Sequence, residues 1–90
     1  MRVVMVGAGY VGLVSGACFA EFGADVTCVD VDENRVDRLR AGEIPLYEPG
    51  LEDLVGRNAA SGRLQFTIGP GPEVGAADLV FIAVGTPASR

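Results

Sequence analysis

Six residues near the start of the chain, Gly7-Ala8-Gly9-Tyr10-Val11-Gly12, have the spacing G-x-G-x-x-G. The first glycine of this pattern permits a tight turn, the second lets the backbone approach a pyrophosphate, and the third lets a helix pack closely on a strand. Backbone N–H groups near Tyr10 and Val11, together with the positive end of the helix dipole, would hold the phosphates. Without a ligand the same pattern is only a tight turn, so its meaning depends on its surroundings.

A carboxylate follows this pattern at the distance that a dinucleotide site requires. Asp30 lies 18 residues after Gly12, at the end of a predicted strand. A carboxylate at this place accepts hydrogen bonds from the hydroxyls of the adenine ribose. A 2′-phosphate would meet like charge there, so Asp30 favours NAD over NADP. The competing interpretation is a turn acid at the end of a strand, but the whole arrangement predicts dinucleotide binding.

Other charged and sulfur-bearing residues have competing interpretations. By spacing alone, Arg35 fits a contact with the ribose or adenine as well as an exposed helix charge, whereas Asp32 is better explained as a helix cap. Cys18 and Cys28 are predicted to be reduced, buried thiols. The chain has no histidine and no CxxC pattern, which excludes zinc and Ser-His-Asp chemistry within it.

The composition argues against several classes of binding partner. The net charge is −5 with no basic run, so nucleic acid is not an expected partner. No apolar run reaches the roughly 18 residues of a membrane span, and the first residues do not resemble a signal peptide. We therefore expect a cytoplasmic protein without a membrane or nucleic-acid partner. The hydrophobic share of 49% is ample for one core.

The glycine pattern and Asp30 need strands and helices to position them. Strands alternate with helices along the chain, which predicts a parallel sheet with right-handed crossovers. The expected strands are 2–6, 25–30, 64–68 and 79–84. The expected helices are 10–22, 33–41 and one that starts at the Pro-Gly turn near 49 and runs to about position 60, with a turn or short helix over 72–77.

The fourth strand, LVFIAV over 79–84, has no polar alternation. A strand of this kind is expected to be covered on both faces. If it were an edge strand it would be an aggregation liability, so the chain looks like the first part of a larger sheet.

The stretch LYEPGLEDLV over 46–55 joins the second helix to the third. Its Pro-Gly turn predicts a helix start, with Pro49 suited to the first helical position. Leu51, Leu54 and Val55 fall on one helix face. Gly62 is expected to end that helix.

Three segments together carry a resemblance to a known family. GAGYVGLVSGACFAEFGADVTCVDVD, AGEIPLYEPGLEDLV and ADLVFIAVGTP resemble, in the right order, the N-terminal part of the UDP-glucose 6-dehydrogenase family. The resemblance implies an α/β fold, with a Rossmann-like parallel sheet and helices on both faces. Residues 1–90 would then be the N-terminal portion of an NAD-binding domain, with the first four strands, in the order 3-2-1-4, of a larger doubly wound sheet. The substrate domain would be absent.

The resemblance also implies an activity and a set of site residues. The family oxidises UDP-glucose to UDP-glucuronate with two NAD⁺, through an aldehyde and a cysteine thioester. The family's catalytic cysteine lies in a Cys-Phe-Pro-Lys stretch that this chain lacks, so no catalytic residue and no activity are expected here. The UDP-sugar would bind to the absent part, and the full-length enzyme would be a homo-oligomer. Cofactor-binding residues implied or predicted are Gly7, Gly9, Tyr10, Val11, Gly12, Asp30, Arg35, Val84, Gly85 and Thr86.

Alternatives to this assignment stay open. Relatives that oxidise GDP-mannose or UDP-N-acetylmannosamine share much of the same pattern. A stand-alone, non-catalytic NAD-binding module is a second possibility. Another β-hydroxyacid or hydroxyacyl-CoA dehydrogenase also begins with G-x-G-x-x-G, but such enzymes are not expected to carry YEPGL.

Overall fold

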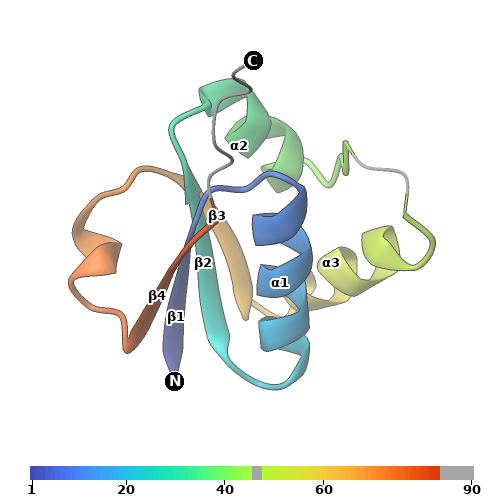
Figure 1. Cartoon of the computed structure of the whole chain (residues 1–90). Helices are drawn as coiled ribbons and strands as arrows, with labels where there is room; N and C mark the ends of the chain where they lie inside the picture. Colours follow the sequence, from blue (N-terminus) through green and yellow to red (C-terminus); the bar gives the residue numbers. More distant parts are fainter. Residues whose placement is uncertain (46–47, 84–90) are drawn as a thin grey trace, which may run out of the picture.

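The computed structural model describes residues 1–45 and 48–83 as a layered α/β structure (Figure 1). Its sheet has four strands in the order β3-β2-β1-β4, and every neighbouring pair is parallel. The strands are β1 (Arg2–Val6), β2 (Asp25–Asp30), β3 (Leu64–Ile68) and β4 (Leu79–Ile82). The predicted strand order and the first three strands are confirmed. The fourth strand ends at Ile82 rather than at position 84, which lies outside the described residues.

The helices are distributed unequally over the two faces of the sheet. Helices α1 (Tyr10–Glu21), α2 (Glu33–Arg40) and α3 (Leu51–Ala60) lie on one side, and the 3-10 helix η1 (Pro72–Val74) lies on the other (Figure 1). This follows from the handedness of the connections. The chain moves in one direction from β1 to β3, so right-handed crossovers place all three helices on the same face. It then returns past β1 to reach β4, which places η1 on the opposite face.

Helix boundaries agree with the capping residues in all but one position. Gly23 and Gly42 have positive φ angles and follow the C-cap residues of α1 and α2, as a helix-terminating glycine does. Asp32 caps α2, and its carboxylate accepts a hydrogen bond from the backbone N–H of Arg35 at 3.1 Å. The prediction that Pro49 is the first helical residue is wrong. Helix α3 begins at Leu51, because Gly50 before it is in the left-handed region with φ +84°.

The main core lies between the sheet and the three α-helices. Alternate strand residues such as Met5, Cys28 and Phe66 are buried against the apolar residues of these helices. Helix α1 contributes residues at three- and four-residue spacing, which leaves Cys18 on its outer side. The prediction that both cysteines are buried is therefore correct for Cys28 and wrong for Cys18, which is exposed.

Strand β4 is an edge of the sheet in the described structure. It pairs with β1 alone, and its four residues keep between 39% and 69% of their surface exposed. On the helical face the ring of Phe81 stacks on Phe19 of α1, with 5.2 Å between the ring centroids. The expectation that this apolar strand is covered on both faces is thus not met within residues 1–45 and 48–83.

Candidate functional site

The glycine loop joins the end of β1 to the start of α1 and is fastened to β2. Gly7, with φ +108°, donates its backbone N–H to the carbonyl of Val29 at 2.7 Å. Ala8 donates its N–H to Oδ2 of Asp30 at 2.8 Å. Two successive backbone groups of the loop are therefore held by the last residues of the neighbouring strand. This places the loop at the carboxyl edge of the sheet, where parallel α/β sheets bind ligands.

Gly12 and Gly9 differ in how strongly the described structure requires a glycine. A Cβ atom on Gly12 would lie 1.8 Å from the carbonyl oxygen of Gly7, so the close contact of helix and loop excludes any side chain. A Cβ on Gly9 would meet no protein atom within 4 Å, and its φ of −74° is allowed for every residue. Neither packing nor backbone conformation within the described structure requires a glycine at position 9. The space beside Gly9 is open at the start of α1.

The start of α1 presents backbone donors to this open space. Gly9 is the N-cap and has no side chain to accept from the helix, and the first turn contains no acidic residue. The first intrahelical bond runs from the N–H of Leu13 to the carbonyl of Gly9 at 2.8 Å. The N–H groups of Tyr10, Val11 and Gly12 precede it and have no intrahelical acceptor. Such a helix start is suited to hold the phosphates of an anionic ligand.

Asp30 is a buried carboxylate with three donors around it. It is 8% exposed, Oδ1 accepts from the backbone N–H of Asp32 at 2.9 Å, and Oδ2 accepts from Ala8 and from Nη1 of Arg35 at 3.1 Å. Burial raises the pKa of Asp30, but the hydrogen bonds from Ala8, Asp32 and Arg35 together outweigh it and leave the pKa below its usual value. A carboxylate offers about four acceptor positions, so one remains for a ligand hydroxyl.

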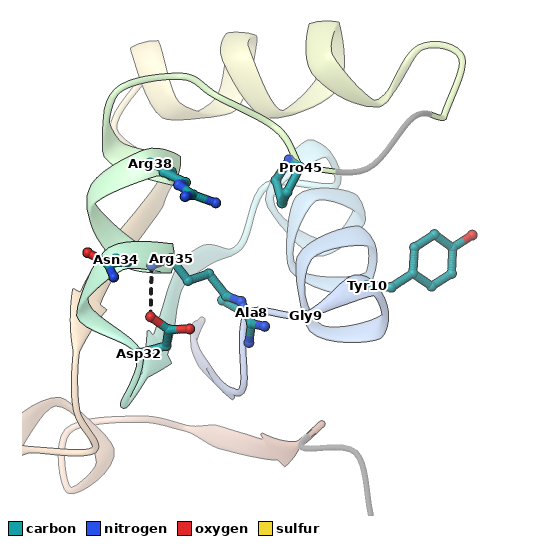
Figure 2. Close-up of a pocket in the computed structure, with 8 residues that line it drawn as sticks. All are labelled: Ala8, Gly9, Tyr10, Asp32, Asn34, Arg35, Arg38 and Pro45. Carbon is teal, nitrogen blue, oxygen red and sulfur yellow. Dashed lines mark hydrogen bonds between the residues drawn. The ribbon is translucent and has the colours of Figure 1, made fainter. Parts of the chain in front are cut away.

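A cavity of about 380 Å³ lies between the glycine loop and α2 (Figure 2). The loop side is formed by Ala8, Gly9 and Tyr10. The opposite wall comes from α2 and its cap, and Pro45 closes one end. The side chain of Tyr10 is half exposed and points away from the cavity in Figure 2. Any contribution of Tyr10 to this cavity is therefore through its backbone.

The structure brings together most of the residues that the sequence singled out. Gly7 to Gly12, Asp30 and Arg35 meet at one edge of the sheet. Val84, Gly85 and Thr86 lie outside the described residues. Sequence reasoning missed four cavity-lining residues, which are Asn34, Arg38, Pro45 and Asp32, the last assigned only to the helix cap. The available signal for Arg38 was its spacing of three residues from Arg35, because residues three apart share a helix face.

The described residues of the site offer backbone donors and a carboxylate, which are groups suited to binding. Burial raises the pKa of the Cys28 thiol to about 12, so this cysteine is not a nucleophile at neutral pH. Within the described part of the chain, no cluster of three or more His, Cys, Asp or Glu residues is placed to hold a metal ion. In the same part, no helix has the length and apolar character needed to cross a membrane.

Three comparisons with known proteins bear on this site. The family model described as UDP-glucose/GDP-mannose dehydrogenase family, NAD binding domain, matches residues 1–90. A UDP-glucose 6-dehydrogenase of Rhizobium meliloti (strain 1021) is 60% identical over 90 residues, which are the whole of this chain and 21% of that protein. The chain spans about a fifth of the length of the curated relatives it matches.

Solved structures show the same fold. A ternary complex of GDP-mannose dehydrogenase from Pseudomonas aeruginosa superimposes with a TM-score of 0.92 at 39% identity, covering all of this chain and 21% of that one. A UDP-glucose dehydrogenase from Pyrobaculum islandicum gives 0.87 at 46% identity, covering 98% of this chain and 20% of that one. The four strands and their order are thus those of larger dehydrogenases.

Proposed function

Because this chain belongs to the UDP-glucose/GDP-mannose dehydrogenase family, whose NAD binding domain it matches over residues 1–90, we propose that it carries part of the NAD site of a UDP-glucose 6-dehydrogenase. Residues 1–90 are then the N-terminal portion of a Rossmann-type domain. The part of NAD assigned to the described residues is the pyrophosphate and the adenosine. When bound, NAD⁺ accepts a hydride from an alcohol.

Each site residue has a role that follows from its geometry. Gly7 and Gly12 shape the loop, and Gly9 leaves room for the pyrophosphate beside the N–H groups of Tyr10 and Val11. Asp30 offers its remaining acceptor position to a ribose hydroxyl. Arg35 orients that carboxylate and borders the cavity. Residues Val84, Gly85 and Thr86 are assigned to the cofactor on their motif alone, since they lie outside the described residues.

Gly9 is the observation that supports NAD binding most directly. A glycine that neither the backbone nor the packing of the described residues requires is explained if an external group occupies the space beside it. A dinucleotide fits this explanation, because its pyrophosphate must approach the backbone at the second glycine of the pattern. The buried carboxylate with one unused acceptor position supplies the second point of attachment, at the ribose.

The complete reaction is proposed for the longer protein. It is the oxidation of UDP-glucose to UDP-glucuronate with two NAD⁺, in a cytoplasmic homo-oligomer whose substrate-binding part is not within these residues. By itself this chain is expected to be inactive, because its sequence has no Cys-Phe-Pro-Lys stretch of the kind that carries the family's catalytic cysteine. The 60% identity to a protein named UDP-glucose 6-dehydrogenase supports this substrate over GDP-mannose or UDP-N-acetylmannosamine, whose enzymes remain the alternatives. A non-catalytic NAD-binding module is the remaining alternative.

The test compares two glycine-to-alanine variants by NAD titration calorimetry. Gly9→Ala should lower NAD affinity by about tenfold or more, because the new methyl group occupies the space assigned to the pyrophosphate. Its stability should change by less than about 1 kcal/mol, since the φ angle is allowed and no atom is displaced. Wild-type affinity in a folded Gly9→Ala protein would refute the assignment of this site.

Gly56→Ala is the matched control. Gly56 lies within α3, and a Cβ there also meets no atom within 4 Å, but it is remote from the glycine loop. This variant should keep the NAD affinity of the wild type. A loss of affinity in both variants would mean that the effect is general and not a property of the loop.

A further inference from the structure

Strand β3 forms the edge of the sheet opposite to β4 and pairs with β2 alone. The carbonyl of Arg63, just before β3, accepts a hydrogen bond from β2 at 2.7 Å, and the N–H of Gly69, just after β3, donates to β2 at 3.1 Å. Along a paired strand, every second residue directs its backbone groups to the same neighbour. Positions 63, 65, 67 and 69 therefore face β2, and the residues whose N–H and C=O groups point out of the sheet are Leu64, Phe66 and Ile68.

A side chain occupies one of these outward groups. Arg40 is the last residue of α2, and its Nε donates to the carbonyl of Phe66 at 2.8 Å. Phe66 is the central residue of β3 and the middle one of the three that face outward. A hollow of about 320 Å³ lies between this edge and the ends of α2 and α3, and its lining residues are Leu39, Arg40, Ala59, Leu64, Gln65 and Phe66. The guanidinium thus lies at the middle of an edge that the two helices leave open.

We propose that Arg40 blocks the pairing of β3 with β3 of a second copy of this chain. The β3 edge would be a self-association surface if this one side chain were removed. The proposal is independent of NAD binding, because no residue of β3 lines the cavity beside the glycine loop.

The outward groups of β3 are arranged for pairing with an identical strand. Two β3 strands related by a two-fold axis at Phe66 would run antiparallel. Leu64 would then lie opposite Ile68 of the other copy, and Phe66 would lie opposite its own counterpart. Residues whose backbone groups face each other in an antiparallel pair exchange both hydrogen bonds. The edge of β3 is therefore complementary to itself, with the carbonyl that Arg40 occupies at its centre.

Arg40 opposes this pairing in two ways. Paired strands lie about 4.8 Å apart, so a guanidinium whose Nε is 2.8 Å from the carbonyl of Phe66 occupies the space that the second strand needs. Displacing this guanidinium breaks its hydrogen bond to the carbonyl. The two-fold axis would also bring the Arg40 side chains of both copies close together, which adds repulsion between like charges.

The test removes Arg40 from a chain whose other sheet edge is blocked. Ile82→Lys places a charge on the edge strand β4, so that association through β4 does not mask the result. Arg40→Met is then added, since methionine keeps an unbranched side chain and favours a helix. This second substitution should strengthen self-association by about tenfold or more, as measured by analytical ultracentrifugation over a concentration series.

Two further measurements connect the effect to β3. Arg57→Met in the Ile82→Lys chain removes the same charge from an exposed position on α3 and should leave self-association unchanged. Amide hydrogen exchange at a low and a high protein concentration reports where two copies meet. In the chain with Arg40→Met, exchange should be at least about tenfold slower at the high concentration for the N–H groups of Leu64, Phe66 and Ile68.

Three results would overturn the proposal. The first is a folded chain with Arg40→Met that associates no more strongly than the Ile82→Lys chain. The second is an equal gain in association for Arg40→Met and Arg57→Met, which would assign the effect to net charge. The third is stronger association without slower exchange at Leu64, Phe66 and Ile68, which would place the contact on another surface.

Discussion

Asp30 connects the glycine loop, the start of α2 and Arg35 through one carboxylate. Its donors are two backbone N–H groups, of Ala8 and Asp32, and one guanidinium. Both backbone groups belong to segments that would line a bound dinucleotide. The same residue therefore shapes the loop before any ligand arrives and offers the acceptor for the ribose. Removing it should affect both stability and binding.

The pH dependence of stability should report on this carboxylate. Because the pKa of Asp30 is lower in the folded chain than the value of about 3.9 in an unfolded one, its contribution to stability is complete above about pH 5. That contribution is lost as the pH falls through the folded-state pKa. Asp30→Asn should cost about 1–3 kcal/mol of unfolding free energy at pH 7, since the amide cannot accept from all three donors. Urea denaturation at pH 7 and pH 3 measures both quantities.

The comparison is made on the difference between wild type and variant. Hydrogen bonds from Asn58 and Arg57 also lower the pKa of Glu21. Glu21 titrates in both proteins, so its contribution cancels in the difference. The difference in unfolding free energy between wild type and Asp30→Asn should be smaller at pH 3 than at pH 7. Asp37→Asn removes an exposed acid from α2 and should behave as the wild type. If this difference in unfolding free energy did not change with pH, the lowered pKa of Asp30 would be contradicted.

At the scale of elements, the distance between α1 and the sheet is set by two glycines. Gly12 permits the contact with the loop, and Gly16 lies against β2. A Cβ on Gly16 would be 2.9 Å from Sγ of Cys28 and 3.4 Å from a methyl group of Val26. Since Cys28 is fully buried, its sulfur has little space into which to move. The position of the phosphate-binding end of α1 depends on this close approach.

Gly16→Ala should therefore destabilise the chain by about 1–3 kcal/mol, although alanine favours a helix. Gly56→Ala, on an open helix face, should instead stabilise it by up to about 1 kcal/mol. Thermal or urea unfolding of both variants separates packing from helix propensity. In a double-mutant cycle, the cost of Gly16→Ala should shrink in a Cys28→Ala background. Additive effects would show that Sγ is not the obstacle.

For the whole molecule, the two edges of the sheet differ in character. The outer edge of β3 bears a polar residue, Gln65, and Nε of Arg40 donates to the carbonyl of Phe66 at 2.8 Å. The outer edge of β4 is apolar, and Ile82 is 69% exposed. A charged or occupied edge resists pairing with another strand, whereas an open apolar edge invites it. Among the described residues, β4 is thus the edge strand that is more open to pairing with another strand.

We expect this chain to self-associate as its concentration rises, with β4 as the contact. Ile82→Lys should weaken the association by about tenfold or more, because a lysine on an edge strand must be desolvated when strands pair. Analytical ultracentrifugation over a concentration series measures the effect. Gln65→Lys places the same charge on the β3 edge and should leave the association unchanged. If both variants associated as strongly as the wild type, β4 would be excluded as the contact.

Much of the fold follows from local sequence patterns. The strands at 2–6, 25–30 and 64–68 and the three helices were predicted because hydrophobic periodicity and capping glycines act over a few residues. The parallel order follows from the alternation of strands and helices. The dinucleotide pattern of Gly7 to Gly12 and Asp30 was recognised for the same reason, since its spacing in the chain reflects one βαβ unit. Spacing left the role of Arg35 open, and the family resemblance singled it out.

The tertiary structure decided what depends on contacts between distant residues. Cys18 was expected inside and is exposed, because only the packing of α1 shows which of its apolar sides meets the sheet. Asn58 is fully buried, with its amide donating to Glu21 at 2.9 Å, in a contact between residues 37 positions apart. Arg38 became part of the site only once α2 lay across from the glycine loop. Sequence spacing determined the dinucleotide motif, whereas its charged wall required the arrangement of the elements in space.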